Sequence, residues 1–205
     1  QTPVVTLRPP FVYGPGNPYY REQFFWDRMR DKRSIVLPGD GRRLMQFVFV
    51  KDLVRAALRA AEAPNAIGHA FNIANSRALT QAELVEALSV CCGKPGVVAR
   101  VPRDRIARSG GHPSGPRLYF GQGFDLPPIT TVISKAQRVL GFAPQWTLDA
   151  GIEQVLDAVR SGTVTDYREA RYSNVKSLAD TAVLPTQLDW ATRLVTEVAR
   201  ASTVA

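Results

Sequence analysis

The chain opens with a short apolar run, Val4–Leu7, which predicts a buried β-strand because it is β-branched and followed closely by proline. Pro9 and Pro10 should end any regular ladder, since neither can donate a backbone N–H. Gly14–Gly16 then predicts a sharp loop. In an open α/β sheet, ligands bind at loops that leave the C-terminal ends of strands. These residues alone, however, favour an ordinary strand followed by a proline-rich turn.

Helical and extended patterns follow one another along the rest of the chain. Apolar residues at helical spacing predict helices over Tyr20–Arg30, Leu53–Ala61, the segment after Thr80, Thr131–Leu140 and Leu148–Val159. Short apolar runs between turn residues predict strands over Ile35–Leu37, Gln46–Val50, His69–Ala74 and Val97–Pro102. Residues 109–128 are rich in glycine and proline and predict a long irregular segment, in which His112 is most simply a surface residue.

Three local signals predict how helices start and end. Asp52 is placed to cap the helix Leu53–Ala61, its carboxylate accepting N–H groups of the first turn. Thr80 and Glu83 have the spacing of a capping box. Gly93, followed by Lys-Pro, should stop the helix that this box begins.

Length and composition are those of a globular domain. The chain has 205 residues, of which 45% are hydrophobic and 21% charged, so it can bury a core of its own. No apolar run approaches the ~20 residues that span a bilayer, and no signal segment is seen. The chain starts inside a predicted strand, which suggests a fragment or a truncated reading frame. The adjacent Cys91 and Cys92 cannot bridge separate elements and fit a reducing, cytoplasmic setting.

The net charge of +8 permits association with nucleic acid or another anion. The densest basic stretch, Arg100–Arg108, also contains Asp104, and no aromatic residues alternate with it as in RNA-binding sheets. Scattered surface arginine is therefore the favoured interpretation, with RNA binding as a minority alternative.

Five motifs in a fixed order carry a family resemblance. They are Arg8–Gly16, Leu37–Gly41, Gln46–Asp52, Phe71–Ile73 and the pair Ser134–Ala136 with Leu140–Pro144. This order, over about residues 3–160, resembles the C-terminal, substrate-binding half of NAD-dependent epimerases/dehydratases, which are extended short-chain dehydrogenases/reductases. Within that superfamily, the stretches around Tyr19–Trp26 and Leu44–Phe47 look most like bacterial relatives of the chloroplast stem-loop-binding proteins.

The resemblance implies an α/β fold. Residues 1–162 would form the last strands of a Rossmann-like parallel sheet and a small α/β substrate-binding domain, while residues 163–205 stay unassigned as a helical tail. It also implies that Asn72 ties down neighbouring backbone. Family members bind NAD or NADP, so one of these is the implied cofactor, and a small molecule is the implied substrate. No metal ligands are expected.

The two motifs that perform the family's chemistry do not occur at their expected place in the order of motifs. The glycine-rich Gly-x-x-Gly-x-x-Gly turn that holds the cofactor pyrophosphate is not in this sequence. A Tyr-x-x-x-Lys pair, whose lysine lowers the tyrosine pKa for acid/base work, occurs only as Tyr172–Lys176, after every other motif. A chance match is the better interpretation of that pair. We therefore assign no catalytic residue and expect the chain alone to be inactive.

The resemblance assigns the remaining site positions to the wall and entrance of a pocket. Pro9 and Pro10 would line the nicotinamide, Phe11 and Tyr13 would face the substrate, and the substrate-binding set continues with Phe25, Arg28 and Met45.

Two positions depart from enzymes that act on nucleotide-sugars. Those enzymes often have asparagine where Phe11 stands, and an arginine for the diphosphate where Met45 stands. Methionine makes no charge-assisted hydrogen bond. Arg42 or Arg43 could take over in space, but a nucleotide-sugar substrate is doubtful.

Two rival interpretations stay open. One is an RNA-binding protein on the same scaffold, like the chloroplast relatives. The other is a remnant that does not fold alone, because the strand Val4–Leu7 lacks its neighbours in the sheet.

Overall fold

A computed structural model of the chain describes residues 2–17, 22–102, 104–105 and 128–162. The predictions for residues 109–127, for His112, for Tyr172–Lys176 and for the tail 163–205 lie outside these ranges. The chain forms two compact units. Within the described ranges, unit 1 takes residues 2–16, 44–79 and 128–162, and unit 2 takes residues 17–43 and 80–105.

Unit 1 is built on parallel strand pairs. β1 (Thr6–Arg8) lies beside β6 (Ala70–Asn72), and β2 (Phe11–Tyr13) lies beside β5 (Phe47–Phe49). The predicted first strand is confirmed, shifted toward the prolines, but it is not buried as predicted, because Thr6 and Arg8 are exposed and Leu7 is half-buried. Pro9 and Pro10 end the β1 ladder and the chain turns at Gly14–Gly16, both as predicted, but the short strand β2 between them was not predicted. The parallel pairing confirms the predicted α/β class.

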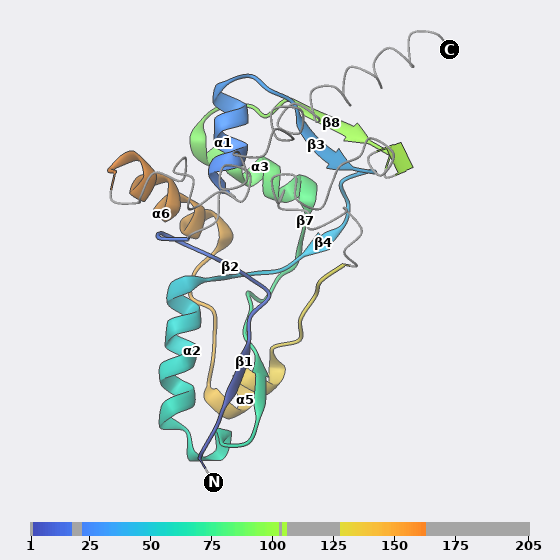
Figure 1. Ribbon diagram of the computed structural model, residues 1–205. Coiled ribbons are helices and arrows are strands. Elements are labelled where there is room, and N and C mark those ends of the chain that lie inside the picture. The colour runs from blue at the N-terminus through green and yellow to red at the C-terminus, as the bar shows by residue number, and fades with distance from the viewer. Residues whose placement is uncertain (1, 18–21, 103, 106–127, 163–205) are drawn as a thin grey trace, which may run out of the picture. The chain divides into compact units, whose positions relative to one another are not determined.

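Helices complete unit 1. β5 leads into α2 (Val50–Glu62), which runs along β1 in Figure 1, and the short helix η1 (Pro64–Ala66) precedes β6. α2 and η1 thus connect the β2–β5 pair to the β1–β6 pair. Further along the chain come α5 (Ser134–Leu140) and α6 (Leu148–Arg160), close to their predicted ranges.

The core of unit 1 gathers apolar residues from three stretches of the chain. Its members are Val48, Ala56, Ala60, Ala66, Phe71, Ile73, Ala74, Ile133, Ala136, Leu140 and Phe142. Three of these core residues are small alanines on α2 and α5, and α5 packs on β6. The predicted role of Asn72 is confirmed, since its Nδ2 donates to the carbonyl of Val132 at 3.3 Å.

The two-residue strands β4 (Leu44–Met45) and β7 (Leu79–Thr80) pair where the chain changes from one unit to the other in sequence.

Unit 2 contains a third parallel pair and two helices. β3 (Ile35–Pro38), buried along its whole length, lies beside β8 (Val98–Val101), as predicted for two extended segments. The described part of the predicted first helix is α1 (Glu22–Arg30), whose Trp26 indole donates to the carbonyl of Leu88 at 3.1 Å.

The helix α3 (Gln81–Cys92) of unit 2 confirms both of its predicted ends. Thr80 and Glu83 form the capping box, with the Glu83 N–H donating to Thr80 Oγ1 at 3.1 Å and the Thr80 N–H donating to Glu83 Oε2 at 2.6 Å. Gly93 closes the helix in the left-handed conformation, at φ 67°.

Three further findings concern the described residues. None of their helices is long and apolar enough to cross a membrane. They hold no group of three or more His, Cys, Asp or Glu side chains that would bind a metal ion. Cys91 and Cys92 form no disulfide.

Candidate functional site

The segment from Pro9 to Gly16 starts at the C-terminal end of β1 and passes through β2. Pro9 and Pro10 are half-buried between the two strands. Phe11 is also half-buried, and its ring lies 5.5 Å from that of Phe47 on β5. The prolines and Phe11 thus form an apolar edge at the end of a parallel strand, which is where α/β folds place ligands.

Tyr13 lies deeper. Only 2% of its surface is exposed, and its ring packs edge-on against Phe49 at 5.3 Å. Its hydroxyl donates to the carbonyl of Thr147 at 3.3 Å. Tyr13 therefore links β2 to the start of α6, and its substrate contact stays a prediction.

The other three predicted site residues are divided between the units. Met45 belongs to unit 1 and is 4% exposed. Phe25 and Arg28 belong to α1 of unit 2, where Phe25 is completely buried. The Arg28 Nε donates to the carbonyl of Ser34 at 2.6 Å. Pro9, Pro10, Phe11 and Tyr13 follow one another along unit 1, and the substrate-binding role of the whole set stays a prediction.

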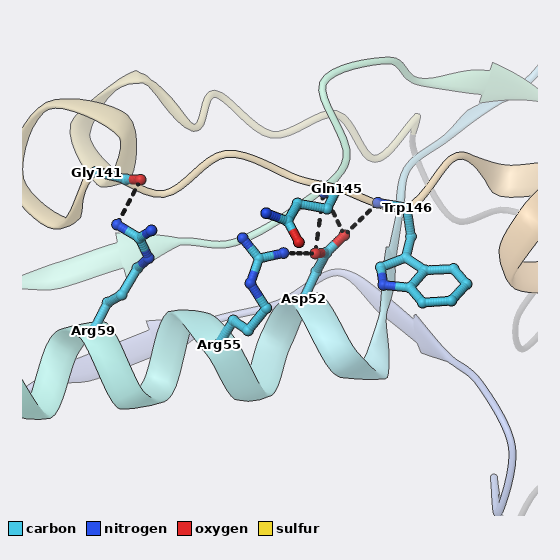
Figure 2. A network of polar contacts seen from close by, with 6 residues as sticks. All are labelled: Asp52, Arg55, Arg59, Gly141, Gln145 and Trp146. Carbon is cyan, nitrogen blue, oxygen red and sulfur yellow. Dashed lines mark hydrogen bonds and ion pairs between the residues drawn. The ribbon is translucent and has the colours of Figure 1, made fainter.

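Asp52 is not the helix cap that the sequence predicted. α2 already begins at Val50, after an N-cap residue, Phe49, without a side-chain cap, so Asp52 lies inside the first turn. Its fully buried carboxylate accepts the backbone N–H groups of Gln145 and Trp146 at 3.1 Å. Figure 2 shows this carboxylate reaching the segment between α5 and α6.

Basic side chains of α2 complete this attachment. Arg55 Nη1 lies 2.8 Å from Asp52 Oδ1, forming an ion pair one turn along the helix. Arg59 donates to the carbonyls of Leu140 and Gly141 at 3.2 and 3.0 Å, at the end of α5. Figure 2 shows the bond to Gly141. Carbonyls at a helix C-terminus favour such a cation.

The Gln46 side chain is a second polar link between separate stretches of unit 1, and the sequence did not reveal it. It is 3% exposed, and its Nε2 donates to the carbonyl of Asn75 at 2.5 Å. Its Oε1 accepts the N–H of Thr131, also at 2.5 Å. In the sequence, the only sign of this role was a polar amide residue directly before the apolar run Phe47–Val50. A buried amide needs partners, but the sequence does not name them.

The described residues of this site do not form a cradle for the pyrophosphate of NAD. Such a cradle needs a glycine-rich turn between a parallel strand and a helix. β5 instead passes directly into α2 without a glycine, and the first turn of α2 carries the Asp52 carboxylate. That carboxylate accepts the backbone N–H groups of Gln145 and Trp146, and its negative charge would repel a phosphate. The apolar residues of the site suit contact with an uncharged part of a dinucleotide. The start of α2 does not suit its phosphates.

Comparison with protein families matches residues 1–74 to the model of the NAD dependent epimerase/dehydratase family. The matched residues carry β1, β2 and β6 together with the two prolines.

Two curated relatives match over most of this chain. The chloroplast stem-loop binding protein of 41 kDa b from Arabidopsis thaliana is 28% identical over 151 residues, covering 72% of this chain and 37% of that protein. The uncharacterized protein YbjS from Escherichia coli is 31% identical over 174 residues, covering 75% of this chain and 49% of YbjS. The chain thus spans half or less of the length of these relatives.

Solved structures show the same fold. The UDP-glucose 4-epimerase of Thermotoga maritima, with UDP-glucose, is 26% identical with a TM-score of 0.56, over 77% of this chain and 46% of that one. The UDP-glucuronic acid 4-epimerase of Bacillus cereus, in complex with NAD, is 23% identical with a TM-score of 0.59, over 78% of this chain and 44% of that one. Over its residues 1–74, the chain is similar to the NAD dependent epimerase/dehydratase family.

Proposed function

We propose that this chain supplies the substrate-binding portion of an NAD(P)-dependent epimerase/dehydratase-like oxidoreductase. The observation that carries the proposal is the connection from β1 through Pro9 and Pro10 to β2. It lies within the family match and presents an apolar surface at the end of a parallel strand. Similar solved structures hold NAD, and NAD or NADP is the cofactor we propose for the complete enzyme.

The cofactor, when bound, would accept or deliver a hydride. The residues of this chain would position and shield it: Pro9 and Pro10 offer the nicotinamide ring an apolar wall without N–H donors. Phe11 extends that wall through its packing against Phe47. Excluding water in this way strengthens the electrostatic interactions of a reacting centre. The family motifs found in this chain include neither the acid/base pair nor the glycine-rich turn that holds the phosphates. We therefore expect the chain alone to be inactive.

The substrate is proposed to differ from the UDP-sugars of the similar solved structures. Met45 is buried and offers no charge to a diphosphate, and Phe11 offers no hydrogen bond. A less anionic, more apolar small molecule suits these two side chains better.

Calorimetry of this chain with NAD and with NADP tests the proposal. We expect no saturable heat, because the phosphates lack their cradle; a Kd weaker than about 1 mM corresponds to a binding free energy smaller than about 4 kcal/mol. Micromolar binding of either cofactor to this chain alone would contradict the assignment of roles.

RNA binding is the second candidate, favoured by the resemblance to the Arabidopsis stem-loop binding protein and by the net charge of +8. If it is correct, a gel-shift titration should show stem-loop RNA bound at low salt. Affinity should then fall steeply as salt rises, because neutralising phosphates releases counterions. No shift at low salt would remove this candidate.

A further inference from the structure

Two sulfur atoms meet in unit 2, between α1 and the end of α3. The thiol of Cys92, the last residue of α3, donates to the thioether of Met29 on α1, with 3.6 Å between Sγ and Sδ. Met29 is 3% exposed, and Cys92 is half-buried. The two residues lie 63 positions apart, so no local motif in the sequence indicated this pair.

The Cys92 thiol has more acceptors around it than protons to donate. Besides Met29 Sδ, the carbonyl oxygens of Ser89 and Lys94 lie 3.5 and 3.7 Å from Cys92 Sγ. A thiol carries one proton and is a weak donor, so it serves one of these three atoms at a time. Three electron-pair donors therefore converge on the place of a single proton. A metal cation in place of that proton would bind to all of them.

The two carbonyls are not equally suited to a cation. The Ser89 carbonyl accepts the backbone N–H groups of Gly93 and Lys94 at the end of the helix, which use both of its lone pairs. The Lys94 carbonyl accepts the Ser89 hydroxyl at 2.7 Å, which holds the carbonyl in place and uses one lone pair. The Lys94 oxygen is therefore the better third ligand beside the two sulfurs.

The sulfur atoms are spaced so that one metal ion can bind both. A metal–sulfur bond is about 2.3 Å long, so a separation of 3.6 Å corresponds to an S–metal–S angle of about 100°, close to the tetrahedral value. The far end of the Met29 side chain is also packed, since a Cβ at Gly96 would lie 3.3 Å from its methyl group. The sulfurs thus need no separation to bind one ion.

The chemistry of these ligands selects a soft, monovalent cation. Thiolate and thioether sulfurs favour Cu(I), whereas harder ions favour oxygen ligands. Among the described residues, no cluster of three or more His, Cys, Asp or Glu side chains offers a divalent ion its usual ligands. One thiolate balances one positive charge, and a neutral pair suits a half-buried position better than a net charge does.

We propose that Met29 and Cys92, together with the carbonyl of Lys94, form a binding site for Cu(I). On binding, a metal–sulfur bond replaces the S–H bond of Cys92, the proton leaves to solvent, and no electron is transferred. The bound ion joins α1 to the end of α3 and stabilises unit 2. Neither sulfur belongs to the predicted cofactor and substrate positions, so the inference goes beyond the proposed function and does not depend on it.

The test is an anaerobic titration of the untagged full chain with Cu(I), supplied by a chromophoric chelator whose absorbance reports the competition. Met29→Leu removes the thioether at nearly constant volume, and Cys92→Ser removes the thiolate. The chain has two methionines and two cysteines, so Met45→Leu and Cys91→Ser are matched controls that remove the other sulfur of each kind. Adjacent residues of a helix do not face the same neighbour, which makes Cys91 a strict control.

We expect the unsubstituted chain and both controls to bind one Cu(I) with the same Kd and to release about one proton per ion. Met29→Leu should bind about 10-fold or more weakly, since even loss of an outer-shell partner commonly costs that much. Cys92→Ser should lose the site. X-ray absorption should show two sulfur ligands at about 2.3 Å in the unsubstituted chain and one in Met29→Leu.

Three results would overturn the inference: an unchanged Kd for Met29→Leu, loss of binding in Cys91→Ser, or no binding by the unsubstituted chain. Thermal melting without metal checks that each variant is folded. Met29→Ile replaces Met29→Leu if the latter does not melt cooperatively, because it also removes the thioether and keeps an apolar side chain at this buried position.

Discussion

Replacing Asp52 with alanine is expected to lower the free energy of unfolding by about 3 kcal/mol, because removing one member of a buried ion pair leaves its partners uncompensated. Three groups lose their acceptor: the N–H groups of Gln145 and Trp146 and the guanidinium of Arg55. The carboxylate itself is fully buried, so water does not replace it without rearrangement. Urea unfolding of the whole chain measures the loss, and hydrogen exchange of residues 145 and 146 locates it.

Two further variants separate the loss of the buried hydrogen-bond acceptor from the loss of a negative charge. Asp149→Ala removes an equal charge from the first turn of α6, where the side chain is exposed, and should cost no more than about 0.5 kcal/mol. Asp52→Asn keeps one acceptor oxygen and should fall between the two. Equal losses for Asp52→Ala and Asp149→Ala would mean that the attachment seen in Figure 2 contributes nothing to stability.

Replacing Gly151 with alanine is expected to cost about 2–3 kcal/mol, although alanine is the better helix former by about 1 kcal/mol. A Cβ at position 151 would overlap the Tyr13 hydroxyl and would lie 2.7–2.8 Å from two ring carbons. Tyr13 cannot yield easily, because its ring is packed between β5 and α6 and its hydroxyl is bonded to Thr147. Thermal melting of the full chain measures the effect.

A double-mutant cycle provides the control for this clash. Tyr13→Ala should be destabilising by itself, as for any buried aromatic residue. Adding Gly151→Ala to it should then cost little or even stabilise, because the clash is gone and the helix propensity improves. If the two losses simply add, the close approach of Tyr13 to α6 is not the reason for glycine at this position.

Features set by neighbouring residues were predictable from the sequence, and features set by distant ones were not. The capping box of Thr80 and the stop at Gly93 depend on residues within a single turn, and both were predicted correctly. Asp52 was misassigned because α2 starts earlier than the strand-like run Gln46–Val50 suggested, and because its partners lie more than 90 residues away.

The strands show the same contrast between features set by neighbouring residues and features set by distant ones. The extended segments at Ile35–Leu37 and Val97–Pro102 were found from their apolar runs, but nothing local indicated that they pair with each other. β2 was missed because the stretch after the two prolines was taken as a turn, whereas it forms a separate strand that pairs with β5. For the candidate site, the family motifs named its positions. The division of those positions between two units required the structure.

The interleaving of the two units has a practical consequence for engineering. Each unit is drawn from separate stretches of the sequence, so no single continuous gene segment encodes either one. Subcloning one unit by cutting at two points would always discard part of it or carry part of the other. A stand-alone version of unit 1 therefore needs short linkers that replace the excursions after residues 16 and 79, and exchange of unit 2 between homologues needs at least two simultaneous grafts.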